Sequence, residues 1–265
     1  MIVHDAHCHY QFAEVPYTAV ELARSEGVGY AVINGSAPVD WPDVLALAQR
    51  DPRNLPAFGL HPWDVPTAPV GWEEQLHAVL KATPHASVGE MGLDRWVTGH
   101  DPAAQAAAFR TQLALAVELD RPLTIHCIKA IGPLLEILRQ DALPRRGFLL
   151  HSWNGPVELV AELAQKGAYF SFSAHHLLER KADLRQQFAA AIPSERLLVE
   201  TDAPALCPPP AWRRHELPLG PAGSASNHPA NLLLNNHELA RTRGLTPEQA
   251  ATLTATNFAR LFLGH

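Results

Sequence analysis

The stretch IVHDAHCH at residues 2–9 is a short, largely apolar run that ends in the pattern His-x-His. Side chains alternate between the two faces of an extended strand, so His7 and His9 point the same way, roughly 7 Å apart along the strand. Two imidazoles on one face can bind the same cation. This stretch therefore predicts a strand whose C-terminal end contributes to a metal site.

Further short apolar runs follow along the chain, separated by longer stretches of helical composition. This alternation is typical of repeated βα units and of a parallel sheet. Eight strands fit a closed (β/α)8 TIM barrel of the α/β class, and the length of 265 residues fits a single domain of this kind, residues 1–265. The predicted strands are residues 2–8, 28–34, 55–61, 86–92, 122–127, 147–152, 168–173 and 196–202. The predicted helices are residues 17–26, 40–50, 71–82, 101–119, 130–140, 156–166, 177–191, 229–243 and 247–262.

The bulk composition is that of a globular protein, with 47% hydrophobic and 18% charged residues. The net charge is −6 and no Lys/Arg block exceeds a pair, so the electrostatic footprint of tight duplex binding is absent. The three cysteines are odd in number and far apart, which argues against a disulfide framework and for a reducing compartment. With no apolar leader and no long apolar window, we expect a cytoplasmic protein that does not enter the membrane. No feature indicates an obligate protein partner.

Four other apolar runs also end in an ionisable residue, namely Glu90, His126, His151 and Asp202. In parallel barrels the C-terminal ends of the strands meet at one mouth, where catalytic groups collect. A lone strand histidine or carboxylate is more often a hydrogen-bonded core residue, but burying this many in one mouth would be costly without a cation. The Pro-rich stretch 203–228 follows the last run, and we expect it to form a wall of this site.

Mixed imidazole and carboxylate ligands suit Zn²⁺, Mn²⁺ or Mg²⁺. Four histidines and two acids exceed the three protein ligands of a single catalytic zinc, so two divalent metal ions are the better count. Two cations about 3.5–4 Å apart can activate a water and stabilise charge on an attacked phosphoryl or carbonyl centre. Asp202 is then the group expected to orient that water and accept its proton.

Eight short motifs lie along the chain: HCH (7–9), GLHP (59–62), GEMGLD (89–94), PLTIH (122–126), HSW (151–153), ETDAP (200–204), NHPANL (227–232) and NFARLF (257–262). Their order and spacing resemble the TatD family of metal-dependent hydrolases and deoxyribonucleases, within the amidohydrolase superfamily. The resemblance spans essentially the whole chain. It implies a metal-dependent hydrolase acting on ester bonds, with nuclease-type phosphodiesterase activity.

The resemblance also implies a distribution of ligands over two metals. One metal would be held by His7, His9, Glu90 and Asp202, and the other by Glu90, His126 and His151, so that Glu90 bridges them. Glu90 and Asp202 are the expected catalytic residues. His61 matches the family histidine next to the substrate phosphate, and we expect Arg95 and Glu200 to be further substrate contacts, Arg95 because it stands at the predicted rim.

The chain also departs from the family pattern. Ile128 followed by Lys129 stands where an arginine is usual, and residues 223–229 lack the usual basic cluster before the motif at 227–232. Phosphate-binding charge is therefore reduced. DNA remains the first candidate substrate. A small phosphoester, amide or lactone is the alternative, and the acidic charge favours it somewhat. A non-catalytic metal-binding scaffold is a second alternative, and the complete ligand set argues against it.

Overall fold

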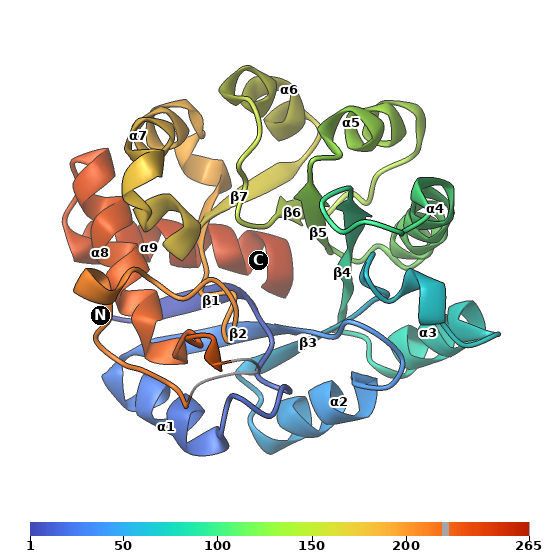
Figure 1. The fold of residues 1–265 in the computed structure, drawn as a ribbon, viewed down its shortest axis with the longest axis horizontal. Coiled ribbons are helices and arrows are strands. Elements are labelled where there is room, and N and C mark those ends of the chain that lie inside the picture. Colours follow the sequence, from blue (N-terminus) through green and yellow to red (C-terminus); the bar gives the residue numbers. More distant parts are fainter. Residues whose placement is uncertain (219–222, 265) are drawn as a thin grey trace.

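The computed structural model describes residues 1–218 and 223–264, and the eight strands found there form one sheet in chain order. Each strand pairs in parallel with the next. Figure 1 shows these strands arranged around a centre with helices outside them. The strands are β1 (Val3–Cys8), β2 (Val28–Asn34), β3 (Asn54–Phe58), β4 (Ser87–Asp94), β5 (Leu123–Ile128), β6 (Phe148–Leu150), β7 (Ala168–Phe172) and β8 (Leu197–Val199).

Backbone hydrogen bonds join the first strand to the segment that follows the last one. The N–H of Asp202 donates to the carbonyl of His7 at 2.9 Å, and the N–H of His9 donates to the carbonyl of Ala203 at 2.7 Å. The ring therefore closes at the same end where the predicted ligands stand. The predicted (β/α)8 barrel is confirmed.

Apart from the last one, the helices alternate with the strands and cover the outside of the ring (Figure 1). Local capping explains where two of them begin: the side chain of Asp101 accepts the N–H of Ala103 before α4, and Thr246 and Gln249 form a capping box on α9. The helices are α1 (Tyr17–Glu26), α2 (Trp41–Arg50), α3 (Trp72–Ala82), α4 (Pro102–Leu119), α5 (Ile131–Gln140), α6 (Val160–Gln165), α7 (Ala182–Ala191), α8 (Leu232–Arg243) and α9 (Pro247–Phe258).

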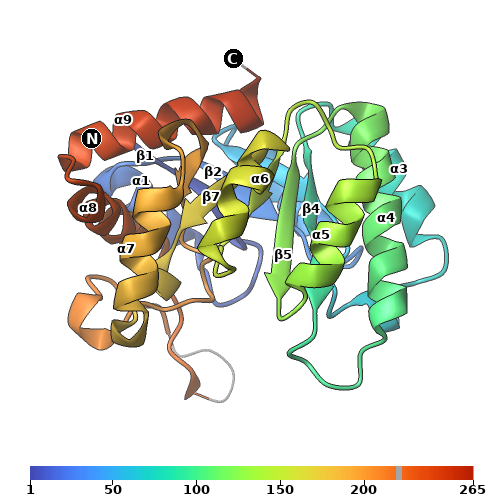
Figure 2. The ribbon, with the colours of Figure 1, turned by 90° about the horizontal axis from the view of Figure 1, so that it is seen from above.

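Helix α9 lies across the end of the barrel at which the strands begin (Figure 2). Phe258, together with Leu261 and Phe262 beyond it, packs on inward-facing strand residues such as Ala6 and Leu198. The alternate strand residues face outward and pack with the helices in a larger cluster, which includes Cys8. Because one end of the barrel is closed by this apolar cap, the opposite end is the one left for the polar residues.

Some elements are shorter than the sequence predicts. The run 147–152 pairs only over β6, and the run 196–202 only over β8, so His151 and Asp202 lie just beyond their strands. Both runs leave the sheet through residues with left-handed backbone, Ser152 at φ 44° and Asp202 at φ 57°. In the described parts of the chain, no helix is both long enough and apolar enough to cross a membrane.

Candidate metal centre

The predicted ligands converge at the C-terminal ends of five strands. His7 and His9 come from the end of β1, Glu90 from within β4, His126 from β5, His151 from just after β6 and Asp202 from just after β8. Apart from His151, which is partly exposed, all of these residues are buried. The sequence-based set of six ligands is thus brought together in one place.

Glycines on either side of Glu90 allow β4 and β5 to approach closely enough for this convergence. A Cβ at Gly89 would collide with the side chain of Thr124, and one at Gly92 with the backbone carbonyl of His126. Gly89 also has a φ of 150°, a backbone conformation that residues with a Cβ rarely adopt. The glycines therefore hold Glu90 and His126 side by side.

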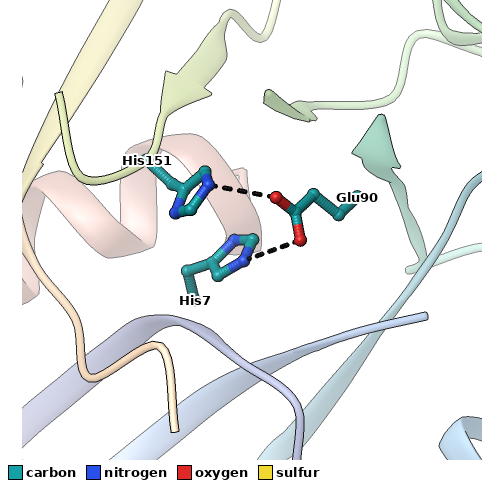
Figure 3. A group of neighbouring side chains, drawn as sticks. All are labelled: His7, Glu90 and His151. Carbon is teal, nitrogen blue, oxygen red and sulfur yellow. Dashed lines mark ion pairs between the residues drawn. The ribbon is translucent and has the colours of Figure 1, made fainter. Parts of the chain in front are cut away.

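Glu90 lies at the centre of the cluster, and each of its carboxylate oxygens faces a different set of histidines. Oε2 is 3.3 Å from Nε2 of His7 and 3.2 Å from Nε2 of His9, and Oε1 is 3.0 Å from Nδ1 of His126 and 3.0 Å from Nε2 of His151. Figure 3 shows Glu90 between His7 and His151. The cluster therefore has two halves that share one carboxylate.

Asp202 belongs to the first half. Its Oδ1 is 3.4 Å from Nε2 of His9 and 3.6 Å from Nε2 of His7. His7, His9 and Asp202 offer ligand atoms close enough together to hold one ion, and so do His7, Glu90 and His151. Because imidazole and carboxylate are common ligands of Zn²⁺ and Mn²⁺, the donor set suits a divalent cation.

His7 gives a more direct test of whether a metal fits. Its side chain is completely buried, and neither ring nitrogen makes a hydrogen bond of good geometry, although Nε2 lies beside the carboxylates of Glu90 and Asp202. A buried polar atom without a partner is costly, so this ring indicates a missing ligand. Burial, with a smaller contribution from the nearby His151, lowers the pKa of His7 and keeps the imidazole in the neutral form that binds metals. The residues present therefore fit a metal.

The ionisation of each remaining group in the cluster depends on the charges of its neighbours. Burial opposes ionisation of Glu90, but the surrounding histidines, His151 and His7 foremost, hold its pKa well below the ordinary range. Burial also opposes protonation of His9, but Asp202 and Glu90 outweigh it and raise the pKa of His9 to about 10. The carboxylates thus need positive charge beside them, which protons supply when no metal is bound.

Three groups behind the ligands orient the rings. His126 contacts Oδ2 of Asp94 through Nε2 at 2.9 Å, His151 contacts Oε1 of Glu200 through Nδ1 at 3.5 Å, and His9 contacts the carbonyl of Asn34 through Nδ1 at 2.7 Å. Such contacts fix which nitrogen is free to face a metal. No role was predicted for Asp94, although it lies four residues after Glu90 on the same strand and the alternation of side chains could have indicated it.

Glu200, which the sequence predicts to contact the substrate, lies behind the cluster of histidines. It is fully buried, accepts a hydrogen bond from the Ser152 hydroxyl at 2.5 Å, and is absent from the residues that line the cavity over the cluster. Asp202, two residues later, does line that cavity. The position of Glu200 behind His151 is suited to holding that ring rather than to meeting a substrate.

A cavity of about 860 Å³ opens over the cluster. His61, expected near the substrate, lines it, and Nδ1 of His61 accepts the N–H of Trp63 at 3.2 Å. The neutral ring therefore carries its proton on Nε2, 3.7 Å from Oε1 of Glu90. His61 lies close enough to Glu90 and His126 to form a ligand group by distance alone, but this tautomer makes Nε2 a hydrogen-bond donor and not a metal ligand.

The cations of the cavity differ from the one expected. Arg95 is exposed and is not among the lining residues, whereas Lys129 and Arg180 are. No role was predicted for Arg180 and no motif marks it, because it lies in a short 3-10 helix, Glu179–Lys181, in the connection after β7. Ala205 and Leu206 of the Pro-rich stretch also line the cavity, as expected for a wall. Residues 219–222 of that stretch lie outside the described residues.

The barrel and its shared carboxylate define a metal-dependent hydrolase. Residues 4–263 match the family described as TatD related DNase. The chain is 32% identical over 254 residues to the 3'-5' ssDNA/RNA exonuclease TatD of Citrobacter rodentium, covering 95% of this chain and 93% of that protein. It is 27% identical over 264 residues to the uncharacterized metal-dependent hydrolase YabD of Bacillus subtilis, covering 97% and 98%. The crystal structure of YJJV, a TatD homolog from Escherichia coli, superposes with a TM-score of 0.88 at 25% identity, covering 98% of each chain. The chain belongs to the TatD-related DNase family.

Proposed function

We propose that this protein hydrolyses phosphodiester bonds in single-stranded nucleic acid with two divalent cations, Zn²⁺, Mn²⁺ or Mg²⁺. The observation that carries the proposal is the position of Glu90, whose two oxygens face two separate sets of histidines. When bound, two such cations polarise the phosphate and lower the pKa of a water. In this proposal one cation is held by His7, His9, Glu90 and Asp202, and the other by Glu90, His126 and His151.

Asp202 is the proposed base. Burial opposes its ionisation, but the hydrogen bond from His9 and the charges of His151 and His7 lower its pKa, so the carboxylate is ionised at neutral pH. It lines the cavity and can therefore accept the proton of an attacking water. Glu90 also lines the cavity, and its proposed catalytic role is to keep the two halves of the centre together.

His61 is the proposed phosphate ligand. Burial, the largest influence, lowers its pKa to about 3, so the ring stays neutral at physiological pH and keeps its proton on Nε2. A neutral N–H can donate to a non-bridging phosphate oxygen without competing for a metal. Glu200 is proposed to position His151 and does not contact the substrate.

A second candidate is a small phosphoester, amide or lactone. The net charge of −6 favours it, as does Asp64, an acid that lines the same cavity and would repel a polyanion. Attack on a carbonyl uses the same groups as attack on a phosphate.

The test is to quantify bound metals in the purified protein and to measure Mn²⁺- or Mg²⁺-dependent release of nucleotides from single-stranded DNA and RNA. We expect about two metals per chain at saturation and release that stops with a chelator. Two metals without nucleotide release, but with hydrolysis of a small phosphoester, amide or lactone, would favour the second candidate. Absence of bound metal under metal-replete conditions would contradict both.

The cavity cations make a further prediction. Lys129→Ala and Arg180→Ala should each raise KM for single-stranded DNA about 5-fold and lower the slope of log kcat/KM against log salt by about 0.7, the change expected for one phosphate contact. Arg95→Ala removes an equally exposed cation outside the cavity and serves as the matched control. If Arg95→Ala changes the salt dependence of kcat/KM and the other two substitutions do not, Arg95 is the residue that contacts the phosphate.

A further inference from the structure

Two tryptophans stand exposed at the cavity. Trp63 follows β3 and is 46% exposed, and Trp96 follows β4 and is 60% exposed. Of the large hydrophobic side chains exposed in the described parts of the chain, these two are the ones that line the cavity. Indole rings that are exposed to solvent at a binding site indicate a ligand with a flat apolar face.

Hydrogen bonds to Asp94 connect both tryptophans to the candidate metal centre. Its Oδ2 accepts Nε1–H of Trp63 at 2.8 Å and lies 2.9 Å from Nε2 of His126, and its Oδ1 accepts the backbone N–H of Trp96 at 2.6 Å. Asp94 thus connects two loops and one predicted metal ligand.

The ring of Trp63 has a defined orientation. It is perpendicular to the ring of His61, with centroids 5.0 Å apart and planes at 89°, and its N–H already donates to Asp94. What Trp63 still offers a ligand is therefore mainly a π-face. This face lies beside His61, the proposed phosphate ligand, so a group that stacks on it is adjacent to the scissile phosphate.

The cations lie elsewhere around the barrel. Lys129 follows β5 and Arg180 follows β7. In a closed ring of eight strands in chain order, the loop after β7 is opposite the loop after β3. The cavity therefore has an aromatic side at Trp63 and Trp96 and a cationic side at Arg180, with the histidine cluster between them.

We propose that Trp63 and Trp96 form a stacking subsite for an unpaired nucleobase next to the scissile phosphate. This inference rests on the proposed nuclease function and adds to it a reason for selecting single strands, because bases paired within a duplex do not expose both faces. Stacking on an aromatic ring tolerates any base, so the subsite selects strandedness and not sequence.

The test compares oligothymidylate with a base-free strand of the same length made of tetrahydrofuran abasic residues, both with the metal-loaded enzyme. The wild type should cleave the base-free strand with kcat/KM about 10-fold lower, the usual effect of losing one stacked base. Trp96→Leu should lose about 10-fold on oligothymidylate and much less on the base-free strand. Trp96→Phe retains a π-face and should recover most of the loss. All these variants keep the backbone N–H that donates to Asp94.

A binding measurement provides an independent result. A phosphorothioate oligothymidylate that resists cleavage should quench tryptophan fluorescence of the wild type, more weakly that of Trp96→Leu, and the base-free phosphorothioate strand should not quench it. Equal kcat/KM of the wild type on the two strands, or equal losses by Trp96→Leu on both, would overturn the stacking subsite while leaving the nuclease function intact. If the wild type cleaves neither strand, the nuclease function fails, and absence of base-dependent quenching would then reject the subsite as well.

Discussion

Asp202→Asn should lower kcat for single-stranded DNA about 1,000-fold at saturating metal, within the range attributed to a general base. Asparagine has nearly the shape of aspartate but cannot accept the proton of an attacking water. Asp202 has a φ of 57°, and asparagine is among the residues that tolerate this left-handed conformation best, so the fold should persist. The measurements are nucleotide release at several metal concentrations and thermal unfolding.

Asp64→Asn is the matched control for this substitution. Asp64 lines the same cavity, but it makes no ion pair with the histidines among the described residues. We expect kcat to change by less than about 3-fold, as for a residue outside the proton transfer. If Asp202→Asn keeps more than a tenth of wild-type kcat at saturating metal, Asp202 is not the base.

The sequence was sufficient to predict that the candidate ligands on strands lie together. His7 lies on β1 and Glu90 on β4, where the alternation of side chains predicts which face of the sheet each residue lies on. The barrel could be predicted for a related reason, because each βα unit has its own local pattern and the closed ring follows from repeating it eight times.

Residues beyond the strand ends were harder to assign. Left-handed residues such as Ser152 and Asp202 break the alternation. Strand alternation would turn Glu200 and Asp202 to the same side, but Glu200 is buried behind His151 while Asp202 lines the cavity. Arg180 lies in a short 3-10 helix after β7 and Trp63 in a turn after β3, and the course of both connections depends on tertiary packing. Nothing local to their sequence indicates that they line the cavity.

The metal-free protein should bind metal more tightly as pH rises, by about 10-fold per pH unit between pH 7 and 9 for each proton displaced. The reason is His9, whose pKa rises from 6.5 to about 10 because Asp202 and Glu90 outweigh the effect of burial. In the metal-free protein this ring is protonated throughout that range, and a metal bound at its Nε2 must displace the proton. Isothermal titration calorimetry in two buffers of different ionisation enthalpy measures the protons released.

The same pKa predicts how the stability of the metal-free protein changes with pH. A group whose pKa is higher in the folded than in the unfolded chain stabilises the fold at low pH, and this stabilisation is lost as pH rises from about 6.5 towards 10. The Tm of the metal-free protein should therefore fall across this window, and bound metal should reduce the fall because it replaces the proton as the positive charge beside the carboxylates.

His77→Gln is the control for both pH measurements, because His77 contacts Glu118 on the outside of the barrel. It should leave the pH dependence of metal affinity as in the wild type, whereas His9→Gln should make it less steep while weakening binding. A metal affinity that is flat from pH 7 to 9 in the wild type would show that protons do not neutralise Glu90 and Asp202 in the metal-free state. The positive charge beside these buried carboxylates would then have to come from ions that metal binding does not displace.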